Sequence, residues 1–184
     1  MHCVLGDAPG GPPPGAGHVI VNLAMTEPSD PLSAPLPEPG SEPTTAVSSS
    51  GPDPETRCPC GSGDTYGRCC RPLHRGRAAA TAEALMRSRF SAFVLGDEGH
   101  LLRTWHPDTR PGSIDLDPDL RWHRLEINAA TGGGPFEEWG TVDFTAHYRP
   151  RPGTRGLKGA QRENSRFRRV DGRWLYLDGA LLSV

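Results

Sequence analysis

Apolar positions change their period along this chain, and the change separates a helical part from a strand part. Between about Ala79 and Gly96 they recur every three to four residues, which predicts an amphipathic helix opened by Thr81. A second, shorter helix is predicted over 97–104, since Pro107 disfavours helical backbone just ahead of it. The apolar stripe of the first helix consists of Ala84, Leu85, Phe90, Phe93 and Val94.

Beyond residue 120 the pattern alternates with a period of two, as it does in half-buried strands. On the last two predicted strands, Glu163, Ser165 and Phe167 share one face, and Trp174, Tyr176 and Asp178 share another. Asp171-Gly172 between them is a favoured pair for a tight hairpin turn. Two helices followed by four antiparallel strands predict an α+β fold. The predicted strands are 121–127, 138–149, 163–170 and 173–178.

Residues 1–56 differ from the rest in composition. They contain twelve prolines, seven glycines and seven acidic residues but no Lys or Arg, giving a formal charge of −7. With few apolar groups to bury, this segment is predicted to be a disordered leader. Met25 is an alternative start, which would leave 1–24 untranslated. The remaining 128 residues carry all 20 basic groups and a charge of about +5, only a weak nucleic-acid signal.

Four of the five cysteines lie within Arg57–Leu73 with the spacing C-x-C-x8-C-C. Structural zinc takes four soft ligands in a tetrahedron, and Pro59 stiffens the tight first half of such a site. A short helix is predicted from near Asp64, ended by Pro72, to carry the second pair of sulfurs back to the ion. The sequence therefore predicts a four-thiolate Zn²⁺ site with the ligands Cys58, Cys60, Cys69 and Cys70.

Three other interpretations of the cysteines are less favoured than zinc. A disulfide framework lacks a secretory context, and a redox dithiol would more usually show C-x-x-C spacing. A ligand set in which His74 replaces one cysteine stays open, although a loop histidine is favoured. No segment is long enough to span a membrane, so the expected location is the reducing cytoplasm.

The cysteine stretch resembles the SEC-C motif first seen at the tail of the SecA translocation ATPase: it reads C-P-C-G-S-G, then Tyr66, then Cys-Cys. The residues that follow, Ala82–Phe93 and Thr104–Pro107, resemble the YchJ-like family. The resemblance implies a SEC-C zinc knuckle followed by a cone-shaped, nuclear-transport-factor-2-like (NTF2-like) domain, in which a curved sheet covers helices around a cavity. The expected division is a leader at 1–56, a knuckle at 57–76 and the NTF2-like domain at 77–184.

The cone's cavity is a second candidate site. A histidine beside a carboxylate could perform general acid–base chemistry there. Structural roles are favoured for the same residues: Trp105 as core, His106 as a hydrogen-bonded helix end, and Glu163 and Arg166 in ion pairs. The pocket candidates are Trp105, His106, Arg110, Glu163, Arg166 and Asp178.

Two functions follow from these sites. The first is a non-catalytic adaptor whose zinc knuckle docks a protein partner, as the resemblance to the SecA tail implies. The alternative is a small-molecule-binding or enzymatic cone domain with a His/carboxylate pocket. Nucleic-acid binding through the arginines around the final hairpin is a weaker third option.

Overall fold

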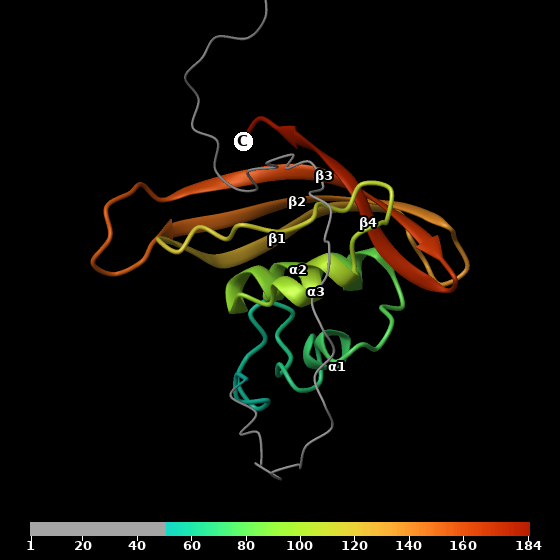
Figure 1. Cartoon of the computed structure of the whole chain (residues 1–184), viewed down its shortest axis with the longest axis horizontal. Helices are drawn as coiled ribbons and strands as arrows, with labels where there is room; N and C mark the ends of the chain where they lie inside the picture. The colour runs from blue at the N-terminus through green and yellow to red at the C-terminus, as the bar shows by residue number, and fades with distance from the viewer. Residues whose placement is uncertain (1–50) are drawn as a thin grey trace, which may run out of the picture.

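The computed structural model describes residues 51–184. Most of the predicted leader, including Cys3 and Met25, lies outside the described residues, and only 51–56 fall within them. Within this range the helices precede an antiparallel sheet and lie beneath it (Figure 1). The α+β class predicted from the sequence is confirmed. The elements are α1 (Arg71–His74), α2 (Ala82–Leu95), α3 (Glu98–Arg103), β1 (Leu120–Gly132), β2 (Trp139–Pro150), β3 (Gly159–Val170) and β4 (Arg173–Leu182).

Helix α2 begins and ends where the sequence predicts. The Thr81 hydroxyl accepts a hydrogen bond from the Ala84 amide at 3.0 Å, which satisfies one of the free N–H groups of the first turn. Gly96 ends the helix in the left-handed region at φ 72°, which costs glycine little. Asp97 then caps α3 by accepting from the His100 amide at 2.8 Å.

The prediction of a helix between Asp64 and Pro72 is wrong. Residues 65–70 form successive turns, and the helical segment α1 begins only at Arg71. Pro72 occupies the first turn of α1, where its fixed φ suits a helix and its missing N–H would have no partner in any case. The proline therefore starts a helix here and does not end one.

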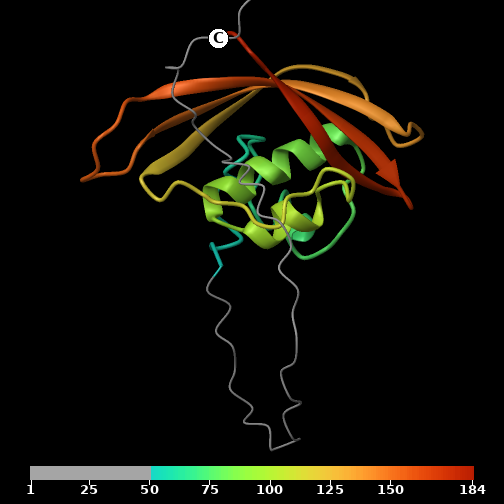
Figure 2. The ribbon, with the colours of Figure 1, turned by 45° about the horizontal axis from the view of Figure 1, so that its top comes forward.

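The sheet has the order β1-β2-β3-β4, with every neighbouring pair antiparallel. Figure 2 shows it arching over the helices, the curved arrangement expected of an NTF2-like cone. Asp171 and Gly172 both have positive φ, at 47° and 75°, as the tight turn between β3 and β4 requires. Register shifts interrupt the pairing of β1 with β2 and of β3 with β4.

One of these shifts changes which way a side chain points. Arg166 pairs with Asp178 and Phe167 pairs with Tyr176, so Leu177 is an extra residue in β4. The predicted common face of Trp174, Tyr176 and Asp178 is therefore broken after Tyr176. Asp178 joins the exposed Arg166 on the outer face, away from the helices.

The main core lies between α2 and the concave face of the sheet. Leu85 and Phe90 from α2 pack against Val142, Phe144 and Phe167 of β2 and β3, and all five are buried. A smaller cluster around Leu101 and Trp105 continues it towards α3. The cysteines form a separate cluster with Tyr66 at the far side of α2.

Candidate functional site

The four motif cysteines gather around one point. Their Sγ atoms all lie within 4.8 Å of one another, although they come from two segments eight residues apart in sequence. The Cys60–Cys69 and Cys69–Cys70 sulfur pairs are 3.5 Å and 3.8 Å apart, and all four cysteines are free thiols. The fully buried Cys60 lies deepest.

Local backbone geometry makes this convergence possible. The amide of Gly61 donates to the carbonyl of Cys58 at 3.1 Å, and Gly61 and Gly63 adopt positive φ of 74° and 93°. The amide of Cys58 donates to the carbonyl of Asp64 at 2.9 Å and closes the loop. The turns after Thr65 then return the second pair of cysteines, a task for which the sequence suggested a helix.

The separations fit a tetrahedral metal site. Four sulfurs at about 2.3 Å from a central ion lie about 3.8 Å apart, close to the distances between these sulfurs. The hydrogen bond with Cys58, and next that with Cys70, lowers the pKa of Cys60, while the contacts with Cys58 and Cys60 raise the pKa of Cys70. Burial raises the pKa of Cys69 to about 11. Sulfurs this crowded cannot all ionise on their own, whereas a divalent cation lets them do so; the four cysteines could hold a metal ion.

Helix α2 supplies a support for the sulfurs. Ser91, which is fully buried, donates from its hydroxyl to Cys70 Sγ at 3.3 Å and lies 3.7 Å from Cys58 Sγ. Ser62 Oγ lies 3.2 Å from Cys69 Sγ on the exposed side. Ser91 therefore joins both halves of the cysteine cluster to α2.

Replacing Ser91 by Ala is expected to weaken metal affinity about tenfold, because a hydrogen bond that favours the thiolate state is lost from the ligand surroundings. The measurement is competition for the metal against a chromophoric chelator. Ser113→Ala in an exposed loop is the matched control. Equal affinities in the two variants would show that the Ser91 hydroxyl only fills space.

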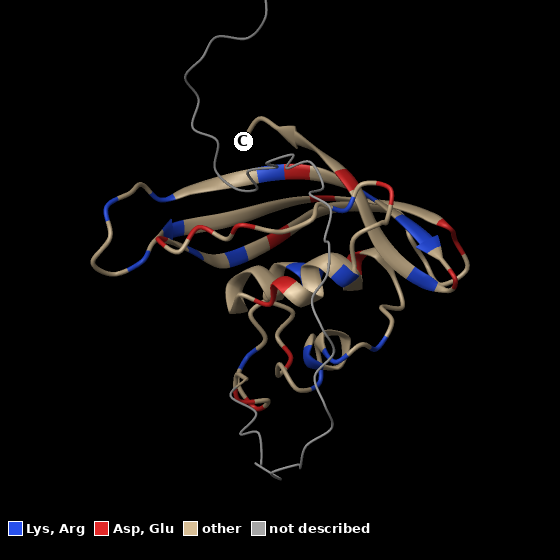
Figure 3. Ribbon diagram, viewed as in Figure 1, with Lys and Arg blue, Asp and Glu red and all other residues tan. Residues whose placement is uncertain are grey.

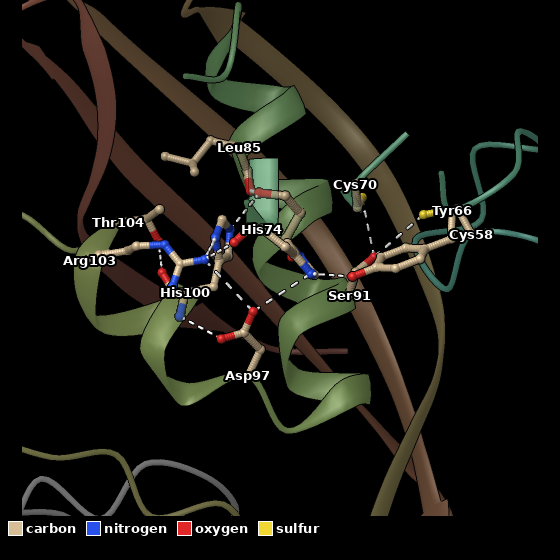
Figure 4. Close-up of polar contacts among 11 residues, drawn as sticks. Cys58, Tyr66, Cys70, His74, Leu85, Ser91, Asp97, His100, Arg103 and Thr104 are labelled. Atoms are coloured by element: carbon tan, nitrogen blue, oxygen red, sulfur yellow. Dashed lines mark hydrogen bonds and ion pairs between the residues drawn. The ribbon is translucent and has the colours of Figure 1, made fainter. Parts of the chain in front are cut away.

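A chain of buried hydrogen bonds continues from the knuckle (residues 57–76) into α2 and α3 (Figure 4). Nε2 of His74 donates to the carbonyl of Ser88 at 2.9 Å, which leaves Nδ1 to accept from the Tyr66 hydroxyl at 3.0 Å. The Ser88 hydroxyl donates to the Leu85 carbonyl and lies 3.0 Å from Nε2 of His100. Burial lowers the pKa of His74 and lowers that of His100 to about 3, so both rings are neutral at pH 7.

The two nitrogens of His74 are thus engaged away from the sulfurs. Among the described residues, the group with metal-ligand geometry comprises the four cysteines. His74 serves to fasten α1 to α2 through the Ser88 carbonyl.

The cavity of the cone lies between α2 and the sheet, with a volume of about 80 Å³. Of the six predicted pocket residues, the structure brings two to its wall, Trp105 and Glu163. Arg166 and Asp178 form a bidentate pair on the outer face instead, Arg166 by the alternation of β3 and Asp178 because of the bulge at Leu177.

His106 and Arg110 also lie away from this cavity. His106 is buried with its ring beside Asp108, and Nδ1 accepts from the Asp108 amide at 3.3 Å. Arg110 is exposed in the loop after α3. No histidine is among the described residues that line the cavity, so the structure does not place a histidine beside Glu163 there.

Sequence reasoning missed the residue at the centre of the cavity, Arg89. It is not among the residues of the predicted apolar stripe, yet it is only 3% exposed and lines the cavity with Tyr176. A stripe argument assigns charged residues to the solvent side, and nothing in the period of α2 marks this arginine as an exception.

Among the helices of the described residues, none combines the length and the apolar character needed to cross a membrane.

Comparison with known proteins gives the same two parts. Residues 56–72 match the SEC-C motif, and residues 81–179 match the model described as "YchJ, middle NTF2-like domain". The boundaries proposed at residues 57, 76 and 77 stay predictions. A UPF0225 protein of Streptomyces coelicolor is 53% identical over 130 residues, covering 70% of this chain and 98% of that protein. A UPF0225 protein of Deinococcus radiodurans is 47% identical over 124 residues, covering 67% of this chain and 88% of that protein.

Solved structures agree with these matches. The solution structure of a SEC-C motif containing protein from Rhodopseudomonas palustris superposes with a TM-score of 0.56 at 34% identity, covering 68% of this chain and 98% of that one. A crystal structure of a SEC-C motif containing protein from Psychrobacter arcticus gives a TM-score of 0.54 at 28% identity, covering 69% of this chain and 84% of that one. With its four-cysteine cluster and its curved antiparallel sheet, the chain belongs to the UPF0225, YchJ-like family, in which a SEC-C motif precedes an NTF2-like domain.

Proposed function

We propose that the four thiolates bind one Zn²⁺ as a structural centre. Four protein sulfurs complete a tetrahedron and leave no open position for a substrate or water, which is the pattern of structural sites. Zn²⁺ with four thiolates carries a charge near −2, and Arg57, Arg68 and Arg71 lie in the same short segment to offset it. The reducing cytoplasm is the compartment in which such thiols stay available for a metal.

This centre supports a binding role for the protein, as an adaptor and not an enzyme. The observation that carries the proposal is the two-sided character of the knuckle. Its inner side is committed to the chain's own α2 through Ser91 and Leu95. Its outer side, from Gly61 to Asp64, is exposed.

The exposed arginines on either side of this outer loop favour an acidic protein surface as the partner. Figure 3 places the basic positions of the knuckle at the end of the molecule opposite the sheet. An acidic partner would gain from guanidinium groups held on a rigid, metal-bound loop, since electrostatic complementarity speeds association and aids selection. The exposed basic residues there are Arg57, Arg68, Arg75 and Arg77.

The adaptor role is tested by capturing partners on the immobilised full chain and titrating each purified candidate. The double variant Arg57→Glu/Arg68→Glu is expected to lower the affinity for a partner that binds the knuckle at least tenfold, since two attractive contacts become repulsive. Arg155→Glu, exposed in the loop between β2 and β3, is the matched control and should bind as the wild type does. Unchanged binding by the double variant, with metal content preserved, would remove the knuckle from the interface.

The identity of the ion is tested separately by native mass spectrometry of the chain purified from cells. One zinc per chain is expected. An iron ion, or a chain that is fully folded without metal, would contradict the proposed centre.

A further inference from the structure

The cavity beneath the sheet is walled mainly by large apolar side chains but holds a buried charge. Phe90, Phe93, Trp105, Trp122, Phe144 and Tyr176 form most of its wall. The guanidinium of Arg89 lies between two of these rings, with its Cζ 5.0 Å from the centre of Trp105 and 4.5 Å from that of Tyr176. An arginine at the base of an aromatic cavity is an arrangement that recognises an anion.

Arg89 is only partly satisfied by the protein. Its hydrogen bonds, to the Leu101 carbonyl at 2.8 Å and to the Thr104 hydroxyl at 2.9 Å, both use Nη1. Nε and Nη2 have no protein acceptor among the described residues, and no carboxylate there lies within ion-pair distance of the group. Burial lowers the pKa of Arg89 to about 10, so the side chain is charged at pH 7. The negative charge of Glu163 acts on Arg89 from beyond ion-pair distance and offsets only part of the effect of burial, so an anion closer to the guanidinium would stabilise the buried charge further.

A second donor on the wall is also without a partner. Nε1 of Trp105 is buried and makes no hydrogen bond in the described chain, although the residue is only 8% exposed. Buried indole N–H groups usually find an acceptor. Nε1 has almost no accessible surface, so an oxygen of a bound molecule would reach it only with a small movement of the ring, which lies in the same cavity wall as Arg89.

Glu163 sets a limit on the charge of the occupant. Its Oε1 accepts from Ser165 Oγ at 2.6 Å and from the Tyr176 hydroxyl at 3.1 Å. Room for this carboxylate depends on Gly179, where a Cβ atom would come within 2.0 Å of Oε1. Glu163 lines the cavity but forms no ion pair with Arg89, so one negative group near the arginine is favoured and a second one near Glu163 is repelled.

We propose that the cavity binds a small organic monocarboxylate with an aromatic or short aliphatic body, its carboxylate held by Arg89 and the Trp105 indole N–H. A cavity of about 80 Å³ is smaller than a phenyl-containing molecule, so part of the body extends through the open side of the cavity. The apolar wall takes the body of the molecule, and Glu163 discriminates against dicarboxylates. This site is separate from the knuckle and does not depend on the adaptor role.

The test uses the zinc-loaded full chain and four probes that share a phenyl ring and differ in the polar group: phenylacetate, phenylacetamide, phenethylamine and phenylmalonate. Isothermal titration calorimetry is expected to show binding of phenylacetate and at least tenfold weaker binding of the uncharged amide, because the charged hydrogen bonds to Arg89 are lost. The amine should show no binding, and the dianion should bind more weakly than the monoanion. Equal affinities for acid and amide, or no binding of phenylacetate at 10 mM, would overturn the proposal.

Variants assign the roles. Arg89→Met is expected to lower the affinity for phenylacetate at least tenfold. Arg168 is exposed on the outer face, so Arg168→Met should leave this affinity unchanged. If Arg89→Met does not fold, Trp105→Phe keeps an aromatic ring but removes the N–H together with part of the indole, and a threefold or greater loss of phenylacetate affinity is expected. Glu163→Gln should reduce the difference between the affinities for phenylacetate and for phenylmalonate. Phenylacetate affinity that is the same in wild type, Arg89→Met and Trp105→Phe would place binding elsewhere.

Discussion

Removing the metal from the full chain with a strong chelator is expected to lower the thermal unfolding midpoint by about 10 °C. A site that binds only the folded state contributes about 4 kcal/mol when free metal exceeds the dissociation constant a thousandfold, and a domain of this size converts that to about ten degrees. Cys60→Ser should have the same effect without chelator, because it removes the most buried sulfur. Differential scanning calorimetry measures both.

The control is Cys3→Ser, which changes the one cysteine outside the motif and should leave the midpoint unchanged. Hydrogen exchange locates the loss. The core between α2 and the sheet contains no cysteine, so β2 and β3 should remain protected in the metal-free chain while residues 57–76 exchange rapidly. Coincident midpoints with and without chelator would show that the cysteine cluster needs no metal to hold its place.

Phe90→Ala is expected to cost about 3–5 kcal/mol in the free energy of unfolding. Phe90 is 2% exposed, belongs to the main core and also lines the cavity, so its removal enlarges an existing space that the rigid sheet cannot fill. Urea denaturation measures the loss. The midpoint should fall while the slope stays the same, since the surface exposed on unfolding hardly changes.

Phe136→Ala provides the matched control, because that ring is 97% exposed in the turn between β1 and β2. Its effect should stay within about 0.5 kcal/mol. Similar losses for the two substitutions would mean that Phe90 is not part of a rigid core.

Much of the fold could be predicted because its signals are local. The ends of α2 follow from Thr81 and Gly96, and the last hairpin follows from Asp171 and Gly172. The alternation of β2 puts Val142, Phe144 and Ala146 on one face, and all three are buried. The gathering of the four motif cysteines also follows from spacing, because two tight pairs on a short segment can reach one point.

The contents of the cavity could not be predicted, because they depend on where distant segments meet. A single extra residue, Leu177, turns Asp178 to the outside, and strand alternation carries no sign of it. Arg89 points inward because α3 offers the Leu101 carbonyl to it, a contact between separate helices. His106 is among the candidate pocket residues, although a structural role is favoured for it, and the chain folds it beside Asp108.

The aromatic wall gives this molecule its own optical reporter. Two of its four tryptophans, Trp105 and Trp122, line the cavity, whereas Trp139 is exposed and Trp174 is packed in the core. Emission from the first two should respond to anything that enters or leaves, and Trp139→Phe would remove the solvent-facing background. Occupancy could then be followed by light in the unlabelled protein, on the millisecond scale of mixing experiments.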